Sequence, residues 1–302
     1  MLFSILIANY NNGHFFKDCY QSILVQTYSN WEVIIVDDCS TDDSVVAIKQ
    51  IIGVDKRFQI YYNEENRGCG YTKNKCAQLA NGKISGFLDP DDALTADALE
   101  LMVIKHKEYK DIAIITSKYE LVDLKMNFIE DGFHGCEIPE NKSYLTYGKG
   151  ALTHFATFKQ NKYNLSVGID IKMKRAVDQD LYFKMEEQGN HLFLNKVLYR
   201  YRIHENSISN NEKIFKAEYW HFYAMERAYK RRKRLQLKTD NFLKEYFNRY
   251  KSNYYFGRFE KIKHTRRFRA KYYFLLQALL AKPSYDFELK IKSLILLIIG
   301  RI

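Results

Sequence analysis

The feature that most restricts the fold is a repeated pattern in the first hundred residues. Short strand-like runs at residues 3–8, 31–36, 58–63 and 84–88 alternate with segments of helical periodicity. Uninterrupted apolar runs are typical of strands buried on both faces, and strands that alternate with helices are joined by right-handed crossovers into a parallel sheet. The chain is therefore predicted to be an α/β protein with a mainly parallel sheet flanked by helices.

Polar side chains stand where these predicted strands end. In a parallel sheet of this kind, ligands bind beyond the carboxyl ends of the strands. We therefore expect one binding rim that gathers Tyr10, Asp38, Asn66, Asp89, Asp91 and Asp92.

The acidic stretch Asp89-Pro90-Asp91-Asp92 needs a partner more than any other part of the chain. Three carboxylates within four positions repel one another unless a cation is present. Mg²⁺ and Mn²⁺ accept such oxygen ligands and fill their remaining positions with substrate phosphates. The alternative is an acidic turn that caps a helix beginning near Thr95. The other polar residues at the same rim favour a metal and phosphate site.

The cysteine and hydropathy patterns indicate a reduced, cytoplasmic protein. The chain has 302 residues, enough for a full core. Its odd number of cysteines includes no C-x-x-C pair, so neither a zinc site nor a disulfide framework is indicated. We expect no signal peptide before the first strand and no apolar run of the roughly 20 residues that span a bilayer. The cysteines are Cys19, Cys39, Cys69, Cys76 and Cys136.

Charge divides the chain near residue 204. Residues 1–204 hold 24 Lys and Arg against 27 Asp and Glu, whereas residues 205–302 hold 23 against 9. We therefore predict a catalytic domain over 1–204 and a basic helical extension over 205–302. The extension interleaves Lys and Arg with aromatic residues. This pattern fits a surface that binds nucleic acid, a set of solvated helices, or a surface that binds an anionic membrane. The apolar segment from Phe287 to Ile299 and the absence of a nucleic-acid motif favour the membrane.

The middle of the chain is less regular. A strand is predicted over residues 111–123, a helix from residue 176 and a strand over residues 192–199. The stretch from 127 to 163 is rich in Gly and aromatic residues, and it fits a sheet insertion or a loop better than a helix. Asp178 and Asp180 fall in the first turn of the predicted helix, where the helix dipole by itself also favours acids.

A set of short motifs occurs in a fixed order along the first half of the chain. They are Ser4-Ile5-Leu6-Ile7, Tyr10-Asn11, Gln26-Thr27-Tyr28, Val36-Asp37-Asp38-Cys39-Ser40-Thr41-Asp42, Asn66-Arg67-Gly68, Asn74 and Leu88-Asp89-Pro90-Asp91-Asp92. Together they resemble the N-terminal half of family 2 glycosyltransferases of the GT-A fold. The resemblance covers residues 3 to about 115, continues more weakly at 177–181 and 199–204, and does not reach the last hundred residues.

The resemblance implies a nucleotide-sugar-binding half over residues 1–115 and an acceptor-side half over 116–204. The aromatic ring of Tyr10 would stack on the nucleobase and the Asp38 carboxylate would accept a base N–H. Asp178 matches the catalytic base. The position before it commonly holds Glu, and here it holds Val177, so Asp180 remains the second candidate.

Further candidate residues lie around the rim and on the acceptor side, and one of them, His154, rests on its Gly-rich surroundings and not on the resemblance. His154, in Gly-rich surroundings, and Asp180 are candidate acceptor-side residues. The metal, Mn²⁺ or Mg²⁺, would be held by Asp91, Asp92 and His204. The nucleotide sugar would contact Ala8, Tyr10, Asp38, Asn66, Gly68, Lys73 and Asp89, with a solvated surface position as the alternative for Lys73.

The function implied is an inverting, metal-dependent transfer of a sugar, of hexosyltransferase type, from a nucleotide diphosphate donor such as a UDP-sugar. The expected acceptor is a glycan or a lipid-linked glycan in surface polysaccharide synthesis, at the inner face of the cell membrane. The Q-x-x-R-W motif of processive members is absent, so single additions are expected. Two alternatives stay open: a metal-dependent nucleotide-sugar hydrolase, and a nucleotide-sugar-binding module without activity.

Overall fold

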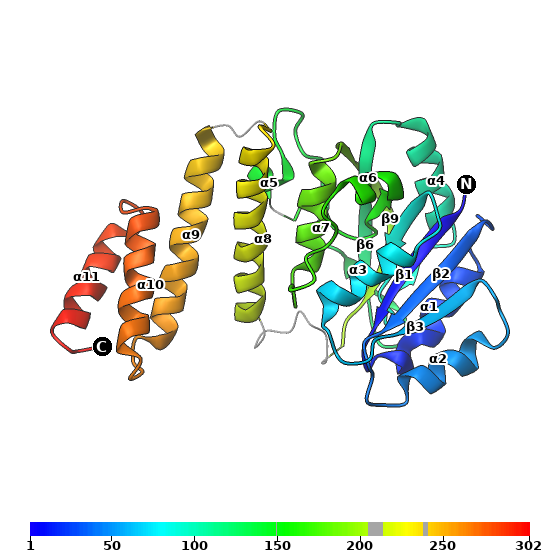
Figure 1. The fold of residues 1–302 in the computed structure, drawn as a ribbon, viewed down its shortest axis with the longest axis horizontal. Helices are drawn as coiled ribbons and strands as arrows, with labels where there is room; N and C mark the ends of the chain where they lie inside the picture. The colour runs from blue at the N-terminus through cyan, green and yellow to red at the C-terminus, as the bar shows by residue number, and fades with distance from the viewer. Residues whose placement is uncertain (149, 205–213, 238–240) are drawn as a thin grey trace. The chain divides into compact units, whose positions relative to one another are not determined.

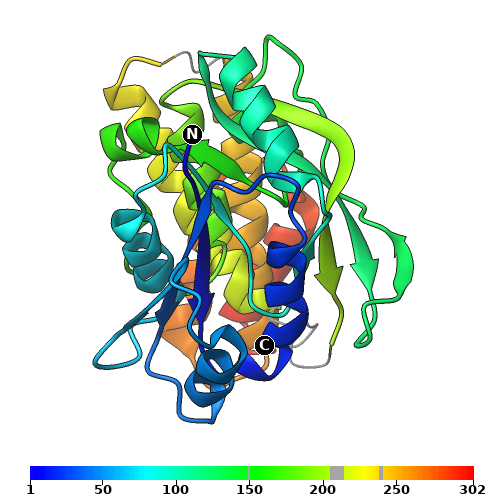
Figure 2. The same cartoon turned by 90° about the vertical axis from the view of Figure 1, so that its right-hand side faces the viewer.

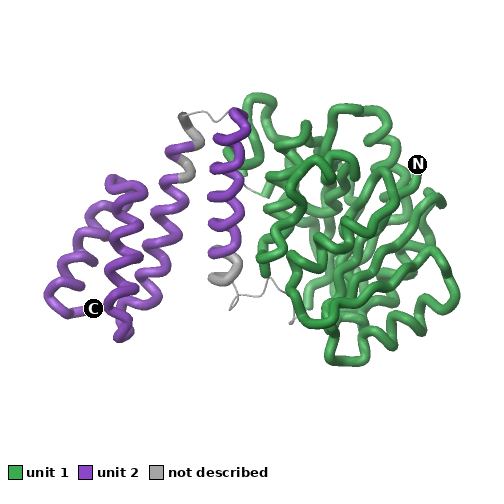
Figure 3. Tube along the Cα trace, in the orientation of Figure 1, with its two compact units in different colours: residues 1–214 green, residues 215–302 purple. Residues whose placement is uncertain are grey.

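The chain forms two compact units, which are described separately. The computed structural model describes residues 1–148, 150–204, 214–237 and 241–302 (Figure 1). Residues 1–214 make up the first unit and residues 215–302 the second (Figure 3). The predicted domain boundary at residue 205 lies outside the described residues and stays a prediction.

The first part of unit 1 follows the predicted alternation of strands and helices. The predicted runs become strands, and helices of nine to eleven residues lie between them and after the last one. The elements are β1 (Phe3–Asn9), η1 (Gly13–Phe15), α1 (Phe16–Leu24), β2 (Trp31–Asp37), α2 (Ser44–Ile52), β3 (Phe58–Tyr62), α3 (Cys69–Leu79), β4 (Ile84–Phe87), β5 (Ala93–Leu94) and α4 (Ala98–Glu108).

The second part of unit 1 holds one long strand pair and several short elements. The sequence did not assign residues 127–163, and the structure places four short elements there. The elements are β6 (Ile112–Val122), β7 (Phe128–Asp131), α5 (Tyr144–Tyr147), β8 (Thr157–Lys159), α6 (Gln160–Leu165), α7 (Val177–Glu186) and β9 (Asn190–Arg202).

One sheet runs through the whole of unit 1, in the order β3-β2-β1-β4-β8-β6-β9-β5, with β7 added to β6. Strands β1 to β4 pair in parallel, as predicted. Beyond β4 the sheet is mixed, because β8 enters antiparallel between β4 and β6, while β6 and β9 are parallel. The α/β class with flanking helices is confirmed, and its parallel character belongs mainly to strands β1 to β4.

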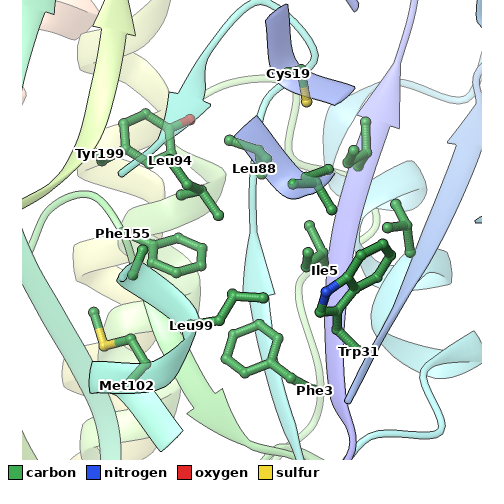
Figure 4. Packing of buried hydrophobic residues seen from close by; sticks show 14 of the residues in the cluster. Phe3, Ile5, Cys19, Trp31, Leu88, Leu94, Leu99, Met102, Phe155 and Tyr199 are labelled. Carbon is green, nitrogen blue, oxygen red and sulfur yellow. The ribbon is translucent and has the colours of Figure 1, made fainter. Parts of the chain in front are cut away.

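Both faces of the parallel strands are covered, which explains their unbroken apolar sequence. Figure 2 shows α1 and α3 on opposite sides of β1. The main core lies on the α1 face, where Ile5 of β1 packs with Cys19 of α1 and Leu99 and Met102 of α4 (Figure 4). These side chains are fully buried. The core therefore fixes the strands whose ends form the predicted rim.

Unit 2 consists of helices, as the sequence predicts for the extension. They are α8 (Ile214–Arg234), α9 (Asn241–Ile262), α10 (Phe268–Ala281) and α11 (Phe287–Ile298). Phe256 and Phe259 of α9 pack with Leu275 and Ala278 of α10 and with Leu297 of α11 in a small core. Among the described residues, none of the helices combines the length and the apolar character needed to cross a membrane.

Candidate active site

The carboxyl ends of β1, β2 and β4 meet at one rim, as the sequence predicts. Asn9 pairs with Asp37, and the Asp38 backbone N–H donates to the Asn9 carbonyl oxygen at 2.8 Å. On the other side of β1, the Leu88 N–H donates to the Leu6 carbonyl oxygen at 3.0 Å. Residues 38 and 89, which follow β2 and β4, therefore flank the end of β1.

The Asp38 carboxylate organises the loop before α3. Its Oδ1 accepts hydrogen bonds from Asn63 Nδ2 and from the Arg67 N–H, and its Oδ2 accepts from the Gly68 N–H, each at 2.8 Å. Gly68 has φ of +86°, a conformation that favours glycine. A carboxylate can accept about four hydrogen bonds, so these three leave room for a nucleobase N–H. That contact stays a prediction.

The other predicted donor contacts lie around Asp38. Tyr10 is 46% exposed just after β1, so its ring is accessible for stacking. Asn66 is exposed in the loop, and Ala8 is half-buried at the end of β1. Asn11, which follows Tyr10, donates its backbone N–H to Ser40 Oγ and accepts the Thr41 N–H at its Oδ1. These hydrogen bonds connect the segment after β1 to the segment after β2. The structure thus brings these positions together, and their roles stay predictions.

Residues 89–92 form the acidic turn, and Asp92 is its buried end. Its Oδ2 accepts from Tyr199 Oη at 2.6 Å, and its Oδ1 accepts from the Arg202 N–H at 2.9 Å. Burial and the nearby carboxylates of Asp91 and Asp89 raise the pKa of Asp92 well above its ordinary value. Asp92 thus joins the turn to β9.

Asp91 forms a pair with His204. Asp91 Oδ2 lies 2.9 Å from His204 Nε2, and the imidazole packs against Phe15 with 4.8 Å between ring centroids. Because Asp92 points to β9, the three predicted metal ligands do not form one cluster. The described residues contain no group of three His, Cys, Asp or Glu side chains that could hold a metal ion.

Lys73 of α3 is a buried cation between two carboxylates. Its Nζ lies 3.1 Å from Asp89 Oδ1 and 3.2 Å from Asp178 Oδ1, and its side chain is 8% exposed. Burial lowers the pKa of Lys73, but Asp178 and Asp89 outweigh that effect and hold it well above its ordinary value. Lys73 therefore stays charged and links the acidic turn to the start of α7.

The two acids in the first turn of α7 have different surroundings. The Asp178 side chain is 48% exposed and contacts Lys73. Asp180 is 1% exposed, and its Oδ2 accepts from Lys184 Nζ at 2.6 Å and from the Asp170 N–H at 2.8 Å. The structure therefore brings Asp178 to the acidic turn and directs Asp180 into an internal ion pair.

His154 lies in an aromatic stack beside the site. Its ring is stacked on Tyr199 and Tyr201, with centroids 4.8 Å and 5.2 Å away, and meets the edge of Tyr119. Burial lowers the pKa of His154 to about 4, so it is neutral at pH 7. The Asp178 charge acts on it through space, which places it near the start of α7.

Two residues that support the acidic turn were not singled out from the sequence. Tyr199 also accepts a hydrogen bond from the Asp89 N–H at 3.2 Å. The Arg202 guanidinium donates through Nε to the Asp91 carbonyl oxygen and pairs through Nη2 with Asp18, both at 2.7 Å. The motif at 199–204 resembles the family, but only this network explains the presence of its Tyr199 and Arg202.

A family comparison agrees with this geometry. The family model described as glycosyl transferase family 2 matches residues 4–159, which is more than half of the chain. The chain belongs to glycosyl transferase family 2. This confirms the family that the ordered motifs resemble, and it covers β1 to β8, where all the predicted donor residues lie.

This family 2 chain is also similar to individual relatives and to solved structures of other proteins. Chondroitin synthase of Escherichia coli is 30% identical over 214 residues, which cover 69% of this chain but only 30% of that relative. The putative teichuronic acid biosynthesis glycosyltransferase TuaG of Bacillus subtilis (strain 168) is 28% identical over 223 residues, covering 74% of this chain and 87% of TuaG. The crystal structure of S. aureus TarS 1-349 in complex with UDP-GlcNAc matches with a TM-score of 0.65 at 17% identity, covering 92% of this chain and 82% of that one.

Proposed function

We propose that this family 2 chain is an inverting glycosyltransferase that moves a hexose-type sugar from a UDP-sugar to a glycan or lipid-linked acceptor in surface polysaccharide synthesis. The observation that carries the proposal is the approach of Asp178 to Asp89 across Lys73. It puts an exposed carboxylate next to the rim at which the donor is expected. The names of TuaG and of the UDP-GlcNAc complex of TarS support the substrate class.

In the proposed reaction the residues of the rim hold the donor and Asp178 acts as the base. Tyr10 stacks on the nucleobase, and Asp38 accepts a base N–H. The Asp178 carboxylate takes the proton of the acceptor hydroxyl. The acceptor oxygen then bonds to the anomeric carbon, while the bond from that carbon to the donor oxygen breaks. The nucleoside diphosphate leaves with the electron pair, and the anomeric configuration inverts.

We propose that Mn²⁺ or Mg²⁺ binds at Asp91 and His204. Their 2.9 Å contact offers one oxygen and one nitrogen ligand beside the rim. Mg²⁺ is usually held by one or two carboxylates together with substrate phosphates, so a small ligand set fits the chemistry. A bound ion would neutralise charge on the leaving diphosphate. In this proposal Asp92 keeps its bonds to Tyr199 and Arg202 and supports the ligands.

A donor and acceptor panel tests the function. The protein is incubated with UDP-, GDP- and dTDP-sugars and Mn²⁺, with and without membrane glycolipid extract, and the released nucleoside diphosphate is measured. Release that depends on the acceptor supports transfer. Equal release without acceptor indicates a hydrolase, and tight donor binding without release indicates a binding module. Chelation with EDTA should abolish release if the metal is required.

We also propose that unit 2 rests on the anionic inner face of the cell membrane. Helix α11 presents an apolar stripe of Phe287, Ile291, Ile295 and Ile298, and Phe287, Ile295 and Ile298 are more than half exposed. The first three of these residues line one groove together with Glu288, Lys292 and Leu296. Residues 205–302 carry 23 Lys and Arg against 9 Asp and Glu, and each basic residue near an anionic leaflet contributes about 1 kcal/mol.

Vesicle flotation tests this membrane contact. Ile295→Glu and Ile298→Glu change exposed positions and leave the small core of unit 2 intact. Both should reduce flotation with phosphatidylglycerol vesicles at physiological salt. The matched control is Val54→Glu, at a residue 97% exposed in unit 1, which should float like the unchanged protein. Equal flotation of all these proteins would remove α11 as the contact.

A further inference from the structure

Lys73 contacts both sides of the candidate site at once. Lys73 belongs to α3, and Asp89 follows β4. Asp178 belongs to α7 and lies 105 residues after Lys73 in the sequence. The two carboxylate oxygens are 3.1 and 3.2 Å from the same ammonium nitrogen. The ammonium itself is buried, whereas the Asp178 side chain is 48% exposed. The fixed partner in this contact is therefore the lysine.

We propose that Lys73 is a positioning residue for the base: it holds the Asp178 carboxylate beside the donor side of the site. This goes beyond a donor contact for Lys73, and it rests on the proposed function of Asp178. Two carboxylates that share one cation would repel each other without it. Removing the Lys73 ammonium therefore leaves the Asp178 side chain free to change its orientation, and the negative charge of Asp89 then repels it.

Three other titratable groups near Asp178 carry no positive charge that could take the place of the Lys73 ammonium. His154 is neutral at pH 7, because burial lowers its pKa to about 4. Burial raises the pKa of the Cys69 thiol to about 12 and that of the Tyr182 hydroxyl well above its ordinary value, so both are neutral too. Asp89 adds negative charge. The groups that interact with Asp178 through space or by contact include Cys69, Lys73, Asp89, His154 and Tyr182.

Removing the charge of Lys73 tests the proposal. Lys73→Met should lower kcat at least tenfold and move the acidic limb of the kcat profile up by one pH unit or more, because protonation of Asp178 becomes easier. Lys73→Arg keeps the charge and should return the limb toward its original position. Lys83→Met, at an exposed lysine in the turn after α3, is the matched control and should leave the limb in place.

A double-mutant cycle separates this role from simple donor binding. If Lys73 acts through Asp178, adding Lys73→Met to Asp178→Asn should lower the residual rate less than twofold. An unmoved acidic limb, a loss of rate as large in the Asp178→Asn background, or an effect confined to donor affinity would overturn the proposal.

Direct titration of Asp178 keeps the inference independent of turnover. In protein labelled with ¹³C at aspartate carboxyl carbons, the Asp178 signal is the one that Asp178→Asn removes. Its pKa should rise by one unit or more in Lys73→Met and should fall in Asp89→Asn, which keeps the lysine and removes the competing carboxylate. The second variant serves if the first does not fold. No turnover with any donor defeats the proposed function, whereas an unchanged Asp178 titration in the variants defeats the role of Lys73.

Discussion

At the scale of single residues, neighbours in sequence take different roles because their side chains enter different surroundings. Asp178 and Asp180 are two positions apart in one helical turn, yet one is half exposed and the other is 1% exposed. Asp91 and Asp92 differ in the same way, since Asp91 meets His204 and Asp92 meets Tyr199. An acidic motif therefore does not define its roles until the partners are known.

Asp180→Asn should lower stability and spare turnover. The substitution removes the carboxylate that pairs with the buried Lys184, and breaking a buried pair in this way costs about 3–5 kcal/mol. Urea denaturation should show this loss. Turnover per folded molecule should stay within about twofold of the unchanged protein. A hundredfold loss of turnover with unchanged donor affinity would instead return Asp180 to the role of base.

His106 should make the folded state sensitive to acid. Its Nε2 lies 3.0 Å from Thr157 Oγ1, and its Nδ1 has no hydrogen-bond partner among the described residues. Burial lowers the pKa of His106 from 6.5 to about 3. Below pH 6.5, His106 is therefore protonated in the unfolded chain but stays neutral in the folded chain. The folded state loses stability as pH falls from 6.5 toward 3.

His106→Gln checks this sign. Between pH 6.5 and 4, the unfolding free energy of the variant should fall less steeply than that of the unchanged protein, by up to about 1.4 kcal/mol per pH unit. Urea denaturation at several pH values measures both slopes. Other carboxyl and imidazole groups titrate in both proteins and cancel in the difference. Parallel slopes would show that the proton on His106 is not linked to folding.

At the scale of elements, α3 carries the lysine of the site and is held at its start by close backbone contacts. The Gly70 N–H donates to the Met173 carbonyl oxygen at 2.9 Å. A Cβ atom at Gly70 would lie 2.5 Å from that oxygen and 2.6 Å from the Asp170 carbonyl oxygen. Residue 70 must therefore be glycine for α3 to pack against the segment before α7.

Gly70→Ala should push α3 away from that segment. Overpacking of this kind costs about 1–3 kcal/mol, and turnover should fall because Lys73 shifts with the helix. Gly257→Ala in α9 is the control, since a methyl group added there would meet no atom within 4 Å outside its own helix backbone, and alanine favours a helix by roughly 0.5–1 kcal/mol. In thermal unfolding, the Tm of Gly70→Ala should be lower than that of the unchanged protein, and the Tm of Gly257→Ala should be higher. Equal stability would contradict the close contact at Gly70.

The sequence predicts the elements that have strong periodicity and misses those that depend on distant partners. The strands β1 to β4 are readable because burial on both faces leaves unbroken apolar runs, and helix α7 is readable because acids stand in its first turn. The three-residue strand β8 has no such repeat, and its pairing with both β4 and β6 is set by tertiary contacts. The approach of Lys73 to Asp178 spans 105 residues and is invisible without the fold.

At the scale of the whole molecule, the first unit combines a parallel part and a mixed part of one sheet. The parallel half places Asp38 and Asp89 at one rim, and the mixed half brings α7 and β9 to the same rim. The acidic turn is tied to β9 through Asp92 and to α7 through Lys73. In our account, the donor and the acceptor meet where these two halves join.

The most direct test of this account is the turnover of Asp178→Asn with a donor and acceptor that the unchanged protein uses. The donor dissociation constant is measured in the same preparation, so that binding and turnover are separated. We predict that turnover falls by about 10²–10⁴-fold while the dissociation constant changes less than about threefold, since only the proton acceptor is lost. Turnover within a few-fold of the unchanged protein would contradict the account.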